Sequence, residues 1–506
     1  MNVNWKHSAV LLIIGVGSFM SSVDSAITSI IVPVVQRDFS TTVAAVQWVS
    51  LAFLVTVSGL LPVFGRLGDL WGHRRVYLSG VLVFTLSSLL CGLAPTVGWL
   101  IGFRVFQAVG SAMVISVAPA ILTLNLPPEN LGRVLGLQLT MTYLGLIAGP
   151  SLGGFITHYW NWRAAFWINV PIGAMLFLAT LWIVSPSGKG RKERFDFMGA
   201  GLLFTAITAL LLGITYGGGT TDAFLRPVLI VLAMVSGFCF VRRELRLESR
   251  QEPLLLHMSL FRNRRFSLSA GVSLVGYTCE FFISFLIPFY VTRVLGLSIS
   301  TVGLLFTLKS FVMVFAAPLA GNLSDRLGPR PLSIASMACY MVSLFLQAHF
   351  TSTSGVIWIA TLLILNGIGA GLFVSPNNSA MLGAAPRSSR GVASAILGLM
   401  RYLGMSLGVA ISGVLLSFQM ASLLEGFRFA MMCGAMIAAS GIVLSMFQQP
   451  AAIVIKGADS EKGGGKQQQF CLPLDFYLTN HGRLWLEGAH SGDYGVSEKL
   501  LKAIRR

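Results

Sequence analysis

The ten-residue stretch GRLGDLWGHR, at Gly65–Arg74, recurs 256 residues later as GNLSDRLGPR, at Gly321–Arg330. The two copies share Gly, Leu, Asp, Gly and Arg at identical offsets, and each lies between two apolar stretches long enough to cross a bilayer. A repeated charged connection between apolar stretches indicates a chain built from two similar halves. We therefore expect a membrane protein with an internal duplication.

The composition supports a membrane protein. Of the 506 residues, 55% are hydrophobic and 11% are charged, against roughly 25% charged in soluble domains. The net charge of +17 arises from Lys and Arg in short connections between apolar runs, so it indicates topology and no nucleic-acid binding. The six cysteines have no CxxC spacing, which indicates neither a disulfide framework nor a metal site, and we expect no cofactor.

A spanning helix needs about 20 largely apolar residues, and fourteen apolar stretches are candidates, of which the eighth is short. They cover residues 9–35, 45–64, 76–95, 99–124, 134–157, 165–184, 196–216, 227–241, 266–291, 300–320, 332–349, 355–377, 391–417 and 427–447. With the N-terminus in the cytoplasm, the inner connections before the tail hold 20 Lys and Arg and the outer connections hold 5. This excess predicts cytoplasmic N- and C-termini and places both copies of the repeat on the cytoplasmic side.

The repeat offset predicts the domain organisation. Two adjacent six-helix halves of about 190 residues would give a shorter offset than 256, so an inserted helix pair is expected between them. We expect an all-α arrangement of two six-helix bundles, at residues 1–190 and 263–447. The helix pair and a cytoplasmic linker take residues 191–262, and residues 448–506 form a flexible cytoplasmic tail.

Five charged side chains are expected at membrane depth, where a charge costs about 2.5–3.5 kcal/mol on insertion scales. They are Asp24, Arg104, Glu280, Lys309 and Arg401. A carboxylate in a semi-dry cavity can exchange protons near neutral pH, so these residues are candidates for proton coupling or substrate binding. The alternative is that the three bases hold the two acids in fixed ion pairs that only join helices. The charge of the substrate stays open.

Glycines on the fifth predicted helix indicate close helix packing. The residues are Gly145, Gly149, Pro150, Gly153 and Gly154. The spacing of 145, 149 and 153 puts three glycines on one face, which allows close backbone approach, and the proline adds a kink. The two interpretations are a moving interface between helices and ordinary membrane packing.

The repeated connection supplies candidates for a cytoplasmic gate. We expect Asp69 to lie at a helix start, where ion pairs with nearby arginines would close the inner face and break when it opens. The alternative is that the arginines only anchor the topology. The candidate gate residues are Gly65, Arg66, Asp69, Gly72, Arg74, Asp325 and Arg330.

Together these motifs resemble the major facilitator superfamily, and within it the fourteen-helix drug:proton antiporters of the EmrB/QacA-like branch. The segment Gly65–Arg75 looks like the cytoplasmic loop signature of the superfamily, and DSAITSIIVP at Asp24–Pro33 is similar to its acidic first-helix motif. Arg104, Gln107 and Gly110 have the spacing of its proton-relay motif.

The glycines of the fifth helix match the antiporter motif GxxxGPxxGG at every fixed position. The resemblance implies a coupling or recognition role for Asp24 and a proton-relay role for Arg104. Lys309 departs from the family pattern, and it leaves open whether the substrates are lipophilic cations.

The expected function is therefore proton-coupled efflux of amphipathic small molecules across the cell membrane by alternating access. One alternative is the same architecture exporting a specific metabolite, a siderophore or a lipid-like compound, and another is a membrane sensor that does not transport. An enzyme or an ATP-driven pump is disfavoured, because HExxH and GxxxxGK[ST] motifs are absent. The expected partners are small molecules, protons and the lipid bilayer; whether a periplasmic adaptor protein takes part, and the oligomeric state, stay open.

Overall fold

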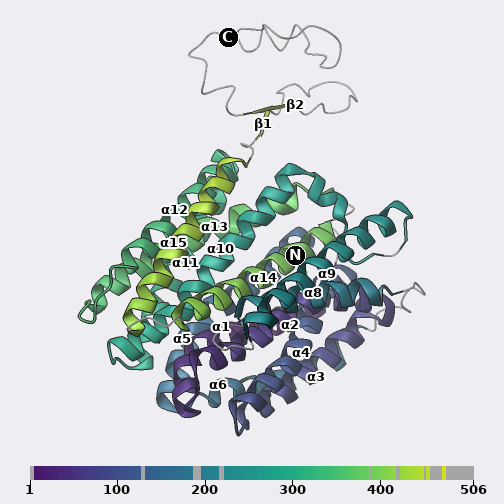
Figure 1. Ribbon diagram of the computed structural model, residues 1–506. Helices are drawn as coiled ribbons and strands as arrows, with labels where there is room; N and C mark the ends of the chain where they lie inside the picture. The colour runs from purple at the N-terminus through teal and green to yellow at the C-terminus, as the bar shows by residue number, and fades with distance from the viewer. Residues whose placement is uncertain are drawn as a thin grey trace, which may run out of the picture. The chain divides into compact units, whose positions relative to one another are not determined.

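The computed structural model describes residues 5–126, 131–185, 195–215, 222–252, 254–386, 390–417, 422–448, 452–455 and 470–473. The chain divides into two compact units, Met1–Gln449 and Pro450–Arg506. The regular elements in the described part of the first unit are all helices, whereas the second unit contains one pair of short strands (Figure 1).

Fourteen long helices and the single turn α6 make up the described part of the first unit. Their bounds are α1 (Trp5–Asp38), α2 (Val43–Trp71), α3 (His73–Gly92), α4 (Val97–Asn125), α5 (Leu131–Tyr159), α6 (Ala164–Trp167), α7 (Asn169–Ile183), α8 (Phe197–Thr215), α9 (Asp222–Ser249), α10 (Arg264–Phe289), α11 (Ile299–Leu327), α12 (Pro329–Gln347), α13 (Val356–Gly383), α14 (Arg390–Ser417) and α15 (Leu423–Met446). A 3₁₀ turn, η2 (Met258–Arg262), precedes α10, and a π-helical turn, η3 (Tyr290–Val294), follows it.

Each predicted span falls on one of these helices, with α6 and α7 together making the sixth. Among the described residues, 13 helices are long and apolar enough to cross a membrane, and α12 is the long helix outside that group. Hydroxyl side chains begin several of them: Thr42, Thr96 and Ser298 each accept a hydrogen bond from the backbone three residues on. Such caps satisfy N–H groups that the first turn of a helix leaves without partners.

The repeated connection is much shorter than expected. Helix α2 continues through the motif to Trp71, and a single residue, Gly72, separates it from α3. Gly72 has φ 95° and Gly328, in the second copy, has φ 80°, a conformation that favours glycine. The expectation that Asp69 lies at a helix start is wrong, because the helix ends only where the glycine reverses φ and Asp69 lies in the last turn of α2.

Helix contacts repeat between α1–α7, here the N-terminal half, and α10–α15, the C-terminal half. Helix α1 packs on α5 as α10 packs on α14, and α2 packs on α4 as α11 packs on α13. Across the two halves, α2 packs on α14 and α5 packs on α11. The helix contacts within the C-terminal half therefore repeat those within the N-terminal half, as expected of a duplicated chain.

Helices α8 and α9 pack on each other, and α8 also lies against α2 and α14, where the two halves meet (Figure 1). Asp196, just before α8, accepts hydrogen bonds from the Arg243 guanidinium of α9, with the closest atoms 2.7 Å apart. Burial raises the pKa of the Asp196 carboxyl, but hydrogen bonds from Arg243 and from the Gly199 backbone outweigh it and hold the pKa below its usual value. Because Arg242–Arg246 continue the helix, α9 is longer than the predicted span 227–241.

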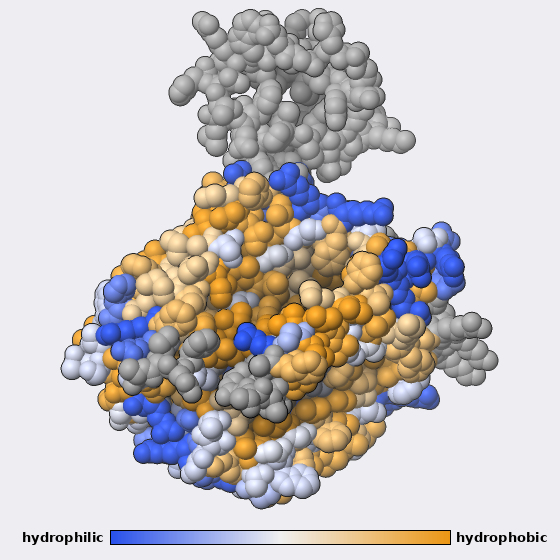
Figure 2. All heavy atoms as spheres, in the orientation of Figure 1, coloured by the Kyte–Doolittle hydropathy of each residue, from blue (hydrophilic) through white to orange (hydrophobic). Residues whose placement is uncertain are grey.

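The surface of the first unit matches a lipid environment. Figure 2 shows apolar side chains over most of the visible face and hydrophilic residues toward its margins. Large apolar side chains are strongly exposed, with Trp182 and Ile357 each 84% accessible. Several exposed tryptophans lie at helix ends, where aromatic residues meet the membrane interface; they are Trp5, Trp71, Trp99, Trp160 and Trp182.

The second unit contains strands β1 (Ala452–Ile455) and β2 (Phe470–Pro473). They pair antiparallel, with Ala452 opposite Pro473 and Ile455 opposite Phe470. The sequence predicts a flexible tail over residues 448–506, and both strands lie within that range. The short apolar segments AIVI and FCLP have the β-branched and aromatic residues that strands favour. The rest of the predicted tail beyond Gln448 lies outside the described residues.

Candidate functional site

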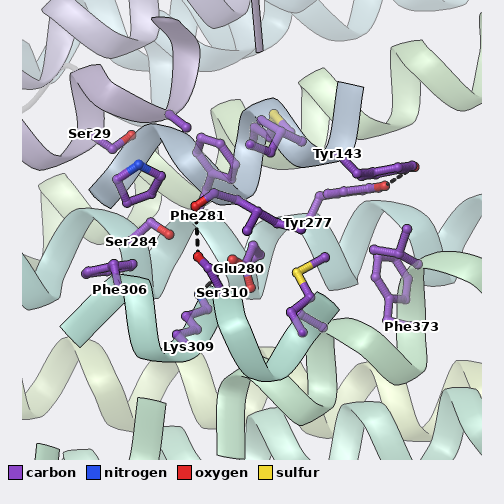
Figure 3. A pocket seen from close by; sticks show the side chains of 18 of the residues that line it. Ser29, Tyr143, Tyr277, Glu280, Phe281, Ser284, Phe306, Lys309, Ser310 and Phe373 are labelled. Atoms are coloured by element: carbon purple, nitrogen blue, oxygen red, sulfur yellow. Dashed lines mark hydrogen bonds and ion pairs between the residues drawn. The ribbon is translucent and has the colours of Figure 1, made fainter. Parts of the chain in front are cut away.

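A cavity lies between the two halves at the middle of the helices (Figure 3). It encloses about 660 Å³, including the part that opens to solvent. Helices α1 and α5 form one wall, and α10 to α14 form the rest. Six aromatic residues line it: Tyr143, Tyr277, Phe281, Phe306, Tyr340 and Phe373. The cavity has the mostly apolar and aromatic lining of a small-molecule site.

An ion pair forms part of the cavity wall. The Lys309 ammonium of α11 lies 2.6 Å from Glu280 Oε1 of α10, and the Tyr340 hydroxyl of α12 donates to Glu280 Oε2 at 2.9 Å. The Lys309 side chain is 4% exposed and the Glu280 side chain is 23% exposed. Glu280 is therefore the more accessible member of the pair, and both oxygens of its carboxylate are engaged.

Tyr143 of α5 joins the two halves beside the cavity. Its hydroxyl lies 2.9 Å from the Tyr277 hydroxyl of α10 and accepts a hydrogen bond of 2.6 Å from Asn378 Nδ2 of α13. A second polar contact crosses nearby, because Ser310 Oγ of α11 donates to the Ile147 carbonyl of α5 at 2.8 Å. Figure 3 shows the two tyrosines side by side at one end of the cavity.

Arg401 of α14 lies behind this tyrosine pair. Its guanidinium carbon is 5.9 Å from the centre of the Tyr143 ring and 5.2 Å from that of Tyr402. The residue is 5% exposed, and its buried Nε has no hydrogen-bond partner among the described residues. Of the three bases that were candidates for pairing with the acids, Lys309 is the partner of Glu280, and Arg401 is not in an ion pair with a described carboxylate.

A second ion pair lies inside the N-terminal half, away from the cavity lining. Arg104 Nη1 of α4 is 2.5 Å from Asp24 Oδ2 of α1, and both side chains are at most 1% exposed. Asp24 Oδ1 accepts hydrogen bonds of 2.9 Å from Gln107 Nε2 and from Asn169 Nδ2. Arg104 also donates to the Val49 carbonyl at 3.1 Å. The Asp24 carboxylate thus receives three donors from two helices and has no exposure to solvent.

The glycines of α5 serve two different interfaces. A side chain on Gly145 or Gly149 would overlap α1 at Phe19 and at Ala26, so this face packs within the N-terminal half. A side chain on Gly154 would instead meet the backbone of Gly303 in α11. Gly153 lies against Ile27 of α1. Pro150, between these glycines, lines the cavity. The predicted helix interface is therefore two interfaces, and only the Gly154 contact crosses between halves.

The candidate gate residues lie at two helix connections, between α2 and α3 and between α11 and α12. Asp69 Oδ2 is 3.4 Å from Arg66 Nη1, and its other oxygen is 3.6 Å from His73 Nε2. Arg74 Nη2 donates to the Leu181 carbonyl at the end of α7, at 2.6 Å. Gly65 lies inside α2, and Arg330 follows Gly328 at the start of α12. The Asp325 side chain lies outside the described part of the chain.

Sequence reasoning found the charged residues of the cavity and missed its aromatic residues. Tyr277, Glu280, Phe281 and Ser284 have spacings of three and four, which put them on one face of α10. The sequence signal for this face is an acidic residue, Glu280, with aromatic and hydroxyl residues at helical spacing on either side of it. Tyr340 carries no such signal, because its role depends on a carboxylate from another helix.

Two helical halves of one membrane chain, packed around a shared cavity at mid-helix, define a membrane transporter. The sequence profile of the Major Facilitator Superfamily matches residues 14–278 and 266–485. The chain belongs to the Major Facilitator Superfamily, whose members are transporters and not enzymes.

Similar proteins include a riboflavin transporter and a multidrug resistance protein. The riboflavin transporter RibZ of Clostridioides difficile is 32% identical over 402 residues, which cover 79% of this chain and 86% of the relative. The multidrug resistance protein Stp of Mycobacterium tuberculosis is 29% identical over 427 residues, covering 84% and 78%. A crystal structure of a bacterial homologue of the human lysosomal transporter Spinster has a TM-score of 0.62 at 15% identity, covering 88% of this chain and 98% of that one. This structural likeness shows the fold.

Proposed function

We propose that the protein is a proton-coupled antiporter that exports amphipathic small molecules, and that it belongs to the fourteen-helix EmrB/QacA-like drug:proton antiporters. The observation that carries this proposal is the aromatic cavity between the two halves, with the Glu280–Lys309 pair in its wall. The multidrug resistance protein among its relatives and the GxxxGPxxGG sequence of α5 support it.

The proposed organisation follows the sequence. Residues 1–190 and 263–447 are the two bundles, residues 191–262 are the inserted pair with its linker, and residues 448–506 are a cytoplasmic tail. Both termini lie in the cytoplasm and the protein is in the cell membrane, on the strength of the Lys and Arg distribution. The α2–α3 connection then lies on the cytoplasmic side, and the Gly154–Gly303 contact lies toward the outer side.

The proposed cycle is alternating access around the cavity. In the outward-open state the Gly154–Gly303 contact and the hydrogen bond from Arg293 to Gln36, 3.0 Å long, are broken. The ion pairs of the α2–α3 connection close the cytoplasmic side in that state and open again in the next one. A proton that enters from outside is taken up by Asp24 or Glu280, and a membrane potential supplies about 2.3 kcal/mol per charge for each 100 mV.

The roles of the two carboxylates differ in this proposal. Asp24 is the main coupling residue, and Arg104 controls its proton exchange from 2.5 Å away. Glu280 and Lys309 handle the substrate at the cavity wall, and Arg401 acts through Tyr143. Each acid is paired in the structure, so proton uptake requires that its partner moves or changes its contacts.

Flux in reconstituted vesicles tests the function. Purified protein is placed in vesicles with an aromatic dye, and dye movement is followed with and without an imposed pH gradient. Flux that depends on the gradient and disappears in Asp24→Asn is the expected result. Saturable dye binding with no accumulation under any gradient would refute transport and favour a sensor.

A second candidate is a transporter of one specific metabolite with the same architecture. The riboflavin transporter among the relatives favours it, because that protein is similar over 79% of this chain. Competition among unrelated compounds for the same flux separates the two candidates: broad competition supports a multidrug antiporter, and inhibition by one chemical series supports a selective exporter.

A further inference from the structure

The charges near the cavity do not cancel. Of the five charged residues predicted at membrane depth, Asp24 pairs with Arg104 and Glu280 pairs with Lys309. Among the described residues, Arg401 has no carboxylate partner, and it is 5% exposed beside the cavity residue Tyr143. Among the described residues, the charges around the cavity therefore sum to one excess positive charge, carried by the buried Arg401. An anionic ligand would neutralise this charge, whereas a cationic ligand would add to it.

Lys309 can reach a ligand in the cavity. It lines the cavity, and its ammonium has three N–H donors, of which Glu280 Oε1 takes one at 2.6 Å. The ammonium also lies 5.3 Å from the centre of the Phe306 ring, so an acidic group held there would lie beside an aromatic wall. Among the described residues, Glu280 is the only carboxylate that lines the cavity. Since it already binds the Lys309 ammonium, it competes with such a group for the same ammonium.

The remaining lining is mostly apolar and aromatic. Phe281, Phe306 and Phe373 present aromatic rings, and Met313 and Met405 present flexible thioethers. Serine hydroxyls at Ser29, Ser284 and Ser310 are the other polar groups of the lining besides the tyrosines and the ion pair. These features fit a planar aromatic body with an acidic group at one edge.

We propose that the cavity takes planar aromatic molecules that carry an anionic group, and that Lys309 binds this group in competition with Glu280. The proposal deepens the proposed function, on which it rests for the statement that the cavity is the transport site. It differs from the export of lipophilic cations, because the charged group that binds the substrate is then the Lys309 ammonium and the substrate is an anion. Equilibrium binding, which needs no proton gradient, tests the ligand class separately from transport.

The experiment compares two xanthene dyes of similar shape and opposite charge, fluorescein and pyronin Y. Fluorescence anisotropy titrations with detergent-purified protein at slightly alkaline pH give their affinities. Wild-type protein should bind fluorescein saturably and more tightly than pyronin Y. Lys309→Met should weaken fluorescein binding roughly tenfold, which corresponds to about 1.4 kcal/mol. Lys309→Arg should retain most of the affinity, and Glu280→Gln should increase it.

Two further variants control for folding and for charge in general. Glu280→Gln/Lys309→Met leaves no unpaired charge in the wall and should bind fluorescein as weakly as Lys309→Met. Arg226→Met removes an exposed cation of α9, which is not a lining helix, and should bind like the wild type. Preference of the wild type for pyronin Y, absence of saturable fluorescein binding, or unchanged fluorescein affinity in both Lys309→Met variants would overturn the proposal. If pyronin Y flux then depends on a pH gradient, the proposed function is still supported and only the ligand class is refuted. If fluorescein binds but no flux is seen, the ligand class is supported and the proposed function is refuted.

Discussion

Replacing Asp24 with asparagine should destabilise the N-terminal half by about 3–5 kcal/mol, the usual cost of leaving one member of a buried ion pair without its partner. The Asp24 carboxylate accepts from Arg104 on one oxygen and from Gln107 and Asn169 on the other. An asparagine has only one acceptor atom. In either orientation its NH2 group faces a donor, so at least one of these hydrogen bonds is replaced by a repulsive contact.

A double-mutant cycle measures how much of this cost belongs to the ion pair. The variants are Asp24→Asn, Arg104→Gln and the double variant, each unfolded at equilibrium in mixed detergent. Because both side chains are at most 1% exposed, the charge left behind in each single variant has no access to water. The double variant leaves no unpaired charge, so its loss of stability should be clearly smaller than the sum of the two single losses.

Additive losses in this cycle would refute the reasoning, because they would mean that the two residues act independently. The same variants are then placed in vesicles. Both single variants should reach the membrane and should lose flux driven by a pH gradient, since the coupling role assigned to this pair needs both members. Full gradient-driven flux in Asp24→Asn would remove Asp24 from the proposed mechanism, whatever the stability measurements show.

Three further predictions concern the contact between halves and the inserted pair. Gly154→Leu should depopulate the observed conformation, which spin-label distances between the halves would measure. Gly136→Leu on the same helix should leave these distances unchanged, because no atom lies within 4 Å of the added Cβ. Tyr143→Phe should weaken the contact between halves by about 1–3 kcal/mol by removing two hydrogen bonds, and Tyr77→Phe, which loses one bond inside the N-terminal half, should leave those distances unchanged. Asp196→Asn should lower stability at neutral pH. Because the folded-state pKa of Asp196 lies below its usual value, the stability difference from wild type should persist above about pH 4. This difference should shrink as the pH falls through the folded-state pKa. A difference that grows in acid would contradict this assignment.

The number and order of the helices could be predicted because a spanning helix imposes a length on its apolar stretch. Helix ends could not, since a helix continues into polar sequence until a residue stops it. Gly72 is such a residue, and the polar segment before it, which looked like a loop, is the last part of α2. The strands β1 and β2 were missed for a related reason: four apolar residues within a polar tail give too little periodicity to indicate a strand.

The charged residues of the site were predictable because charges are rare and costly in apolar segments. Their pairing was not, because it depends on which helix faces are in contact. The aromatic residues of the lining could not be predicted, because many other aromatic residues lie in the same apolar stretches. Phe306 and Phe311 lie on the same helix, yet Phe306 lines the cavity at 1% exposure and Phe311 is 61% exposed on the outside. Apolar residues face lipid as readily as they face a cavity, so composition alone cannot separate them.

Helix α5 connects the cavity to the buried Asp24 pair by direct packing. Tyr143, near its middle, bonds to the C-terminal half through Asn378, and two residues later Gly145 lies against the α1 backbone at Phe19. Gly149 continues this contact to Ala26, so the α1 segment in contact with α5 includes Asp24. Because glycine leaves no flexible side chain between the two backbones, a rotation of α5 that breaks the Tyr143 contacts must be accommodated by α1. The glycine face of α5 therefore links the cavity to the buried Asp24–Arg104 pair by a close helix contact. In the proposed mechanism, this contact would carry movement from the substrate site to the proton site.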